Sequence, residues 1–200
     1  MKNVILLCWL LFLCLSHNSY PQNRTIHELN YEQGLHPATS LNRMLQDHRG
    51  FIWIGGSNYG LQRYDGYEFV DYDQFKSLIL YLDEDSKGLL WLGTNNGFYV
   101  MNPENEKFLH YAPITPNKYT SNYVTKVIED HNGNYWCATI NYLFKMESKV
   151  KEGERIKDLI FKNGIDSVFT FTRFAFPRSD SLLWATCDVF EDSRGYIWAG

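Results

Sequence analysis

Three observations on this 200-residue chain predict an all-β fold. The pattern Asp-x-x-Gly-x-x-Trp occurs four times, and short segments typical of strands flank each copy. The first two intervals between copies match the length of one four-stranded sheet. Aromatic residues, which suit the half-buried surface of a sheet, make up 16% of the chain. Together these features predict a partial β-propeller of antiparallel four-stranded blades, with about three blades and the start of a fourth.

The first 22 residues are expected to lie outside this fold. Lys2 precedes an almost wholly apolar run at 4–16, and polar residues follow, which is the pattern of a signal peptide. The run is too short to span a membrane comfortably. A lipid anchor on Cys14 is a less favoured alternative, and the cleavage site stays open. We therefore expect residues 1–22 to be a signal peptide and processing region, and residues 23–200 to form an incomplete propeller outside the cytoplasmic membrane.

Charge and cysteine content limit the partners and cofactors. The formal net charge of −4 argues against nucleic acid, because few basic residues could replace phosphate counterions. After processing, two cysteines remain, Cys137 and Cys187. An oxidising compartment permits a disulfide between them, and two separate buried thiols are the favoured alternative. The sequence has no CxxC motif and no Cys/His cluster at metal spacing, so we expect neither a metal nor a cofactor.

The repeat places an aspartate, a glycine and a tryptophan at constant spacing. The tryptophans are 38, 45 and 62 residues apart, and the longer last interval implies an insertion of roughly twenty residues. Each aspartate follows a Glu or a Gln. The twelve residues are Asp47, Gly50 and Trp53; Asp85, Gly88 and Trp91; Asp130, Gly133 and Trp136; and Asp192, Gly195 and Trp198.

Each element of a blade follows from its position in the repeat. The segment before the aspartate predicts the first and innermost strand, and the segment after the glycine predicts the second. A third strand is expected in the first three copies and a fourth strand in the first two. The insertion at about 147–183 begins with a mixed-charge run that we expect to be solvated, and its SVFTFTRFAF segment alternates in a way that predicts an extra strand. The blades are expected near 40–72, 78–111, 123–183 and 184–200.

The repeated carboxylates are expected to be structural. An aspartate can accept hydrogen bonds from the amides of a tight turn, and the glycine can adopt a positive φ. The tryptophan ring can fill the space between neighbouring sheets. Because a catalytic site is used once whereas a turn recurs in every blade, we expect no catalytic residue among them.

The copy at 45–72, LQDHRGFIWIGGSNYGLQRYDGYEFVDY, resembles the two-component regulator propeller repeat nearly end to end. The second copy loses only the RYD ending. In the third copy, Cys137 and Ala138 replace the apolar–glycine pair, and the hairpin glycine before Tyr142 is missing. The resemblance covers about 29–200.

This resemblance implies a function. It suggests the N-terminal part of the periplasmic sensor region of a Bacteroidetes-type hybrid two-component system histidine kinase. In that family, two propellers precede a β-sandwich, a transmembrane helix, a histidine kinase, a receiver and an AraC-type DNA-binding domain. The family senses breakdown products of complex glycans. The resemblance thus implies a glycan oligosaccharide as ligand, an anchor in the inner membrane and, in the full-length protein, a possible homodimer.

Four residues are candidates for ligand binding: Arg43, Tyr81, Lys126 and Asp188, each four residues before a motif aspartate on the expected innermost strand. They could line a polar, aromatic surface suited to sugar rings, and ordinary strand positions are the alternative. The insertion is expected to form a binding rim, a dimer contact or an addition without a ligand. A secreted propeller enzyme acting on polysaccharide and a protein-interaction scaffold remain alternative functions, although no catalytic set is evident.

Overall fold

The computed structural model describes residues 28–36, 41–57, 60–75, 77–112, 122–140, 142–150, 154–175 and 188–200. The expected signal peptide and Cys187 lie outside these residues. The chain divides into the units Met1–Asn30 and Tyr31–Gly200, and every helix and strand named below belongs to the second unit.

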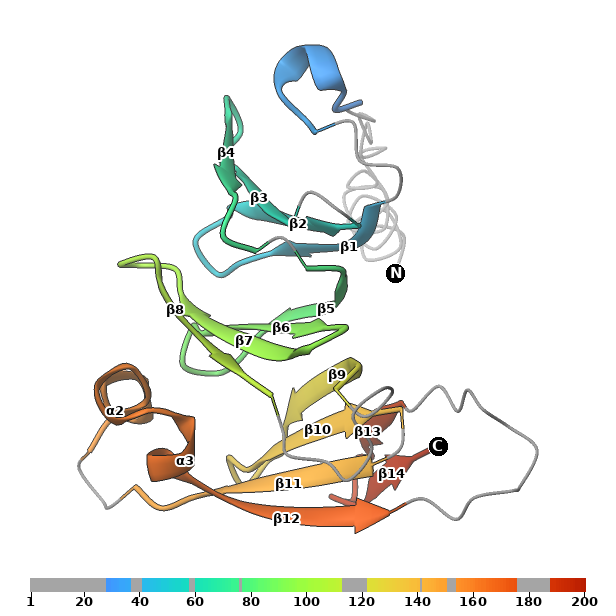
Figure 1. The fold of residues 1–200 in the computed structure, drawn as a ribbon, viewed down its shortest axis with the longest axis vertical. Helices are drawn as coiled ribbons and strands as arrows, with labels where there is room; N and C mark the ends of the chain where they lie inside the picture. The colour runs from blue at the N-terminus through green and yellow to red at the C-terminus, as the bar shows by residue number, and fades with distance from the viewer. Residues whose placement is uncertain are drawn as a thin grey trace, which may run out of the picture. The chain divides into compact units, whose positions relative to one another are not determined.

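The described strands form three four-stranded antiparallel sheets and one two-stranded sheet (Figure 1). The first sheet contains β1 (Leu41–Gln46), β2 (Ile52–Gly56), β3 (Leu61–Tyr64) and β4 (Phe69–Tyr72). The second contains β5 (Ile79–Glu84), β6 (Leu90–Thr94), β7 (Gly97–Asn102) and β8 (Lys107–Tyr111). The third contains β9 (Val124–Glu129), β10 (Tyr135–Thr139), β11 (Tyr142–Ser148) and β12 (Phe169–Ala175). The fourth contains β13 (Val189–Glu191) and β14 (Ile197–Ala199).

Each four-stranded sheet is a meander, because its strands pair in chain order. Strand β5 contacts both β1 and β9, and β9 contacts β13, so the first strands of successive sheets are neighbours. This arrangement makes the first strand of each sheet the innermost one. The all-β, propeller-like fold predicted from the sequence is confirmed.

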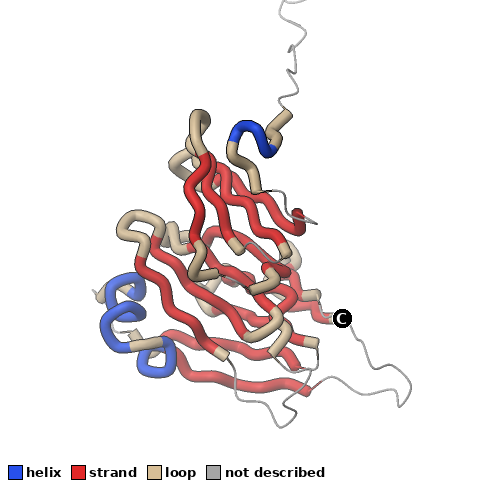
Figure 2. Tube along the Cα trace, turned by 45° about the horizontal axis from the view of Figure 1, so that its top comes forward, coloured by secondary structure: helices blue, strands red, loops and turns tan. Residues whose placement is uncertain are grey.

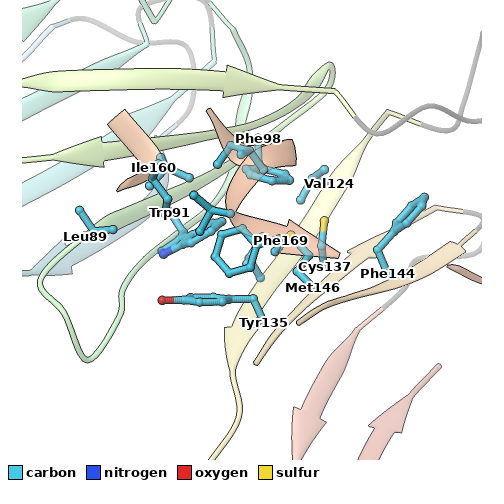
Figure 3. Close-up of a cluster of buried hydrophobic side chains, with 14 of the residues drawn as sticks. Leu89, Trp91, Phe98, Val124, Tyr135, Cys137, Phe144, Met146, Ile160 and Phe169 are labelled. Atoms are coloured by element: carbon cyan, nitrogen blue, oxygen red, sulfur yellow. The ribbon is translucent and has the colours of Figure 1, made fainter. Parts of the chain in front are cut away.

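Apolar side chains fill the space between neighbouring sheets. Trp53 lies among buried residues of the first and second sheets, and Trp91 lies in the cluster between the second and third. Both indoles are almost wholly buried, with exposures of 0% and 2%. Figure 3 shows Trp91 beside Tyr135 and Phe169 in this second cluster. Burial of such large rings is a main source of the free energy that holds one sheet against the next.

The insertion differs from its expected structure. Helices α2 (Ile156–Asn163) and α3 (Ile165–Val168) lie between β11 and β12, at the edge of the sheets seen in Figure 2. The segment expected to be an extra strand is β12, the fourth strand of the third sheet, which pairs along the whole of β11.

The helices form because part of the expected solvated run is amphipathic. Ile160 is fully buried, while Ile156 and Leu159 pack on the same cluster as partly buried neighbours. Gly164 ends α2 at a φ of 84°, a conformation that glycine adopts without strain. α2 also contacts β8, so the insertion joins the outer part of the second sheet to the third. Within the described residues, no helix has the length and apolar character needed to cross a membrane.

Candidate functional site

The aspartate of the repeat is held by its own turn and its own tryptophan. In the first sheet, Asp47 Oδ1 accepts hydrogen bonds from the backbone amides of Arg49 and Phe51, each at 3.0 Å. Asp47 Oδ2 accepts one from Trp53 Nε1 at 2.9 Å. Gly50 adopts a φ of 92° in this turn. The same indole-to-carboxylate bond recurs at 2.8 Å in Asp85–Trp91, 2.9 Å in Asp130–Trp136 and 3.1 Å in Asp192–Trp198.

These carboxylates are suited to accepting hydrogen bonds rather than to exchanging protons. Burial raises the pKa of Asp47, but the hydrogen bonds from Trp53 and Arg49 outweigh that effect and hold the pKa below its ordinary value. Burial also raises the pKa of Asp130, but hydrogen bonds from Trp136 and Asn134 outweigh it, so the pKa lies below its ordinary value. Both groups therefore stay ionised at neutral pH, where a general acid would need its proton.

A glutamate precedes the aspartate in three of the four copies, and it makes a contact that the sequence reading missed. Glu84 accepts a hydrogen bond from the backbone amide of His48, in the turn of the preceding sheet, at 2.8 Å, and also contacts His48 Nδ1. Glu191 binds His131 in the same way, with 2.9 Å between the backbone amide nitrogen and Oε2. We call each such contact a clasp: the glutamate before a motif aspartate bound to the turn of the preceding sheet.

The clasp between the second and third sheets has different donors. Glu129 accepts hydrogen bonds from the Ser86 amide and hydroxyl at 2.9 and 3.0 Å, and it also binds the Lys87 ammonium group. Burial raises the pKa of Glu129, but Lys87 and Ser86 outweigh it, so the pKa lies below its usual value. Two features of the sequence indicate these contacts. A glutamate precedes three of the four aspartates, and a histidine directly follows the aspartate in two of the turns.

The four candidate ligand residues occupy equivalent places on the innermost strands. Arg43, Tyr81 and Lys126 lie on β1, β5 and β9, and Asp188 directly precedes β13. The register shifts just before each of the first three, which is the behaviour of a β-bulge that re-aims side chains. The residues opposite them are small: Gly55, Gly93 and Ala138.

The structure brings three of the four close together. Lys126 Nζ lies 2.8 Å from Asp188 Oδ1, and this ion pair joins the third and fourth sheets. Tyr81 is 8% exposed and donates its hydroxyl to Asp83 at 2.7 Å. Burial and Asp83 raise the pKa of Tyr81, and Asp188 adds to this effect. Asp83 is therefore a further member of the cluster that sequence reasoning did not identify.

Arg43 is the fourth candidate and the most accessible cation of the set. Its guanidinium donates to the Asn42 carbonyl at 2.8 Å, and its charge acts against the rise in the pKa of Tyr81. We refer to Arg43, Tyr81, Asp83, Lys126 and Asp188 as the inner-strand cluster. It presents charged donors and acceptors beside a buried phenol.

A cavity of about 400 Å³ lies between the second and third sheets, close to the clasp. Its lining includes the carboxylates of Asp83, Asp85 and Glu129 and the ring of Tyr135. No group of three or more His, Cys, Asp or Glu side chains in the described part of the chain is placed to hold a metal ion.

Comparison with known proteins identifies the repeat. Residues 118–141 match the family model described as the two component regulator propeller. That segment is similar to the two-component regulator propeller repeat. This match falls on β9 and β10 of the third sheet, the copy that departs most from the repeat at Cys137 and Ala138. The search of curated proteins found no match.

Solved structures share the fold of this propeller-repeat chain. The extracellular domain assigned to a hybrid two component system of B. thetaiotaomicron is 20% identical, with a TM-score of 0.59. The match covers 88% of this chain and 22% of that one. Virginiamycin B lyase from Staphylococcus aureus is 14% identical, with a TM-score of 0.54, over 78% of this chain and 47% of that one. The chain thus spans less than half of either structure, and at these identities the likeness concerns the fold.

Proposed function

We propose that this chain belongs to the extracytoplasmic input region of a two-component signalling protein. The observation that carries the proposal is the match of residues 118–141 to the two component regulator propeller family. The fold shared with an extracellular domain of a hybrid two component system supports the same role. The turn aspartates fit it too, because they are engaged in hydrogen bonds within the sheets.

We propose further that the ligand is a glycan-derived oligosaccharide bound at the inner-strand cluster. Sugar hydroxyls both donate and accept hydrogen bonds, so they need charged or polar groups of both kinds in one place. Arg43 and Lys126 supply donors, and Asp188 supplies an acceptor whose side chain is 71% exposed. We also propose that the full-length protein forms a homodimer, and light scattering, which measures the mass of the particle in solution, tests this.

Calorimetry of the complete extracytoplasmic protein against a panel of glycan oligosaccharides tests this ligand class. Lys126→Gln breaks the pair with Asp188 and is expected to weaken binding, by about tenfold if one charged contact is lost. Lys107→Gln, at an exposed position on the outer strand β8, is the matched control and should bind as the parent does. An absence of binding heat with every sugar would contradict the glycan proposal.

A polysaccharide-cleaving enzyme is the alternative, since the lyase that shares this fold is an enzyme. Incubation with the same polysaccharides and measurement of new chain ends distinguishes the two functions. Binding without cleavage supports the input role, and cleavage with turnover supports the enzyme.

We also propose export and anchoring in the inner membrane, as the resemblance to the sensor family implies. Fractionation of cells that express the full-length protein tests this location. Recovery in the cytoplasmic fraction would contradict it.

A further inference from the structure

The clasp between the third and fourth sheets is built on a histidine that reaches the next turn. Glu191 binds both the backbone amide and the ring of His131. The His131 ring also lies against Gly195, where an added Cβ would be only 2.8 Å from His131 Cε1. The ring therefore fits because the next turn has a glycine at this place. The imidazole side chain remains 59% exposed, so it can exchange its proton with solvent.

The clasp between the first and second sheets has the same construction. Glu84 binds the amide and ring of His48, and the ring lies against Gly88, where an added Cβ would be 3.1 Å from His48 Cε1. The His48 side chain is 55% exposed.

The clasp between the second and third sheets lacks such a group. Its donors are Ser86 and Lys87, so it contains no histidine, the side chain whose ordinary pKa lies nearest neutral pH. Two clasps that contain a histidine thus flank one that does not.

We propose that the His48 and His131 clasps make two of the three sheet-to-sheet contacts depend on pH, while the contact held by Ser86 and Lys87 does not. An imidazolium bound to a carboxylate makes a charge-assisted hydrogen bond, which is about twice as strong as a neutral one. Loss of the proton removes the positive charge of the ring, and the remaining bond between a neutral imidazole and the carboxylate is weaker. These two contacts should therefore loosen as the pH rises.

The carboxylates around His131 fix the sign of this effect at that clasp. The hydrogen bond with Glu191 raises the pKa of His131 above its usual 6.5, and the nearby carboxylate of Asp130 adds to it. A raised pKa in the folded state gives stability that is present below 6.5 and lost as the pH rises through the folded-state pKa. The charged groups near His48 are Glu84, Asp47 with its partner Arg49, and Glu104 with its partner Lys157.

Hydrogen exchange at three backbone amides tests the proposal in the complete extracytoplasmic protein. The amides of His48, Ser86 and His131 each donate to a clasp glutamate, so each reports on one contact. Between pH 6 and pH 8, after correction for the intrinsic rate, protection at His48 and His131 should fall by about 3- to 10-fold, because a weaker clasp opens more often. Protection at Ser86 should stay constant. Equal protection of His131 at the two pH values, or an equal fall at Ser86, would overturn the proposal.

Two variants make the test sharper. His131→Ser gives the third turn the residue that the second turn has naturally, so protection at position 131 should become independent of pH. His110→Ser removes an exposed histidine of β8 outside the clasps and should leave all three amides as in the parent. Retention of the full pH effect in His131→Ser would contradict the assignment. If this variant fails to fold, the comparison of His131 with Ser86 in the parent protein still decides.

Discussion

The hydroxyl of Tyr135, in the third sheet, donates a hydrogen bond to Asp85, in the second sheet, over 2.6 Å. Asp85 is already bound to the Trp91 indole of its own sheet at 2.8 Å. One carboxylate therefore joins two neighbouring sheets as well as capping its turn. The equivalent positions in the other copies are Ile52, Leu90 and Ile197, so only the second carboxylate receives such a donor among the described residues.

Removal of this hydroxyl should weaken the contact between the second and third sheets. Tyr135→Phe leaves the ring in place and removes one hydrogen bond to a charged acceptor, so we expect a loss of about 1–3 kcal/mol in unfolding free energy. Tyr67→Phe is the control, because Tyr67 is 93% exposed. Denaturant titration measures both variants, and equal stability of the two would show that the bond contributes nothing.

Gly93 should be sensitive to the smallest possible substitution. A Cβ at this position would lie 2.5 Å from the Val124 carbonyl oxygen and 3.0 Å from Tyr81 Cβ, so Gly93→Ala forces the innermost strands apart. We expect it to cost about 1–3 kcal/mol, the range of an overpacked core. Ala138→Gly, at the matching position of the third sheet, should cost only about 0.5–1 kcal/mol. Thermal or denaturant unfolding compares the two, and an unchanged stability for Gly93→Ala would contradict the close approach.

Asp47 should contribute to stability in a way that depends on pH. It is 3% exposed, and Asp47→Asn would place an amide NH₂ or a single oxygen where two amides and an indole now donate, so we expect a loss of about 1–3 kcal/mol at neutral pH. Because the folded-state pKa is lowered, the stabilisation is present above the ordinary value of 3.8 and is lost as the pH falls through the folded-state pKa. The difference between parent and variant should therefore shrink in acid. Asp73→Asn, at an exposed position, is the control for the substitution and should leave the unfolding free energy at neutral pH unchanged.

The helical insertion should behave as part of the core. Ile160 is fully buried between α2 and the sheets, so Ile160→Ala is expected to cost about 2–5 kcal/mol. Lys162→Ala, on the exposed face of the same helix, tests helix propensity alone and should change stability by less than about 0.5 kcal/mol. Similar losses in both variants would show that α2 does not pack as described.

Local chemistry explains which features the sequence could predict. The turn built on Asp47 and Gly50 depends on residues within six positions of one another, so a repeated pattern was enough to identify it. The clasps join residues 36, 43 and 60 positions apart, and only the register of neighbouring sheets brings them together.

The helices of the insertion could not be predicted from the sequence for a different physical reason. Ile156 and Ile160 lie one helical turn apart, but the charged residues around them resemble a solvated run, and their burial depends on contact with β8. The alternation of apolar and polar residues in β12 predicts a strand, as the structure shows. Its partner β11 is separated from it in the chain by α2 and α3, so the pattern alone does not identify that pairing. The position of the four ligand candidates in the repeat predicts that they belong to the innermost strands. Asp83 is different, because only its hydrogen bond with the Tyr81 hydroxyl places it in the cluster.

In the last three repeats, the adjacent acids serve different sheets: Asp130, for example, binds its own turn, while Glu129 reaches back to the sheet before it. This division gives the array a direction, because each sheet offers an acceptor on one side and a donor on the other. Every junction uses the same pair of groups, a glutamate of the later repeat and the backbone amide of the residue after the aspartate in the earlier one. A repeat that brings its own glutamate can therefore be added next to any of these turns, whatever side chain that turn carries.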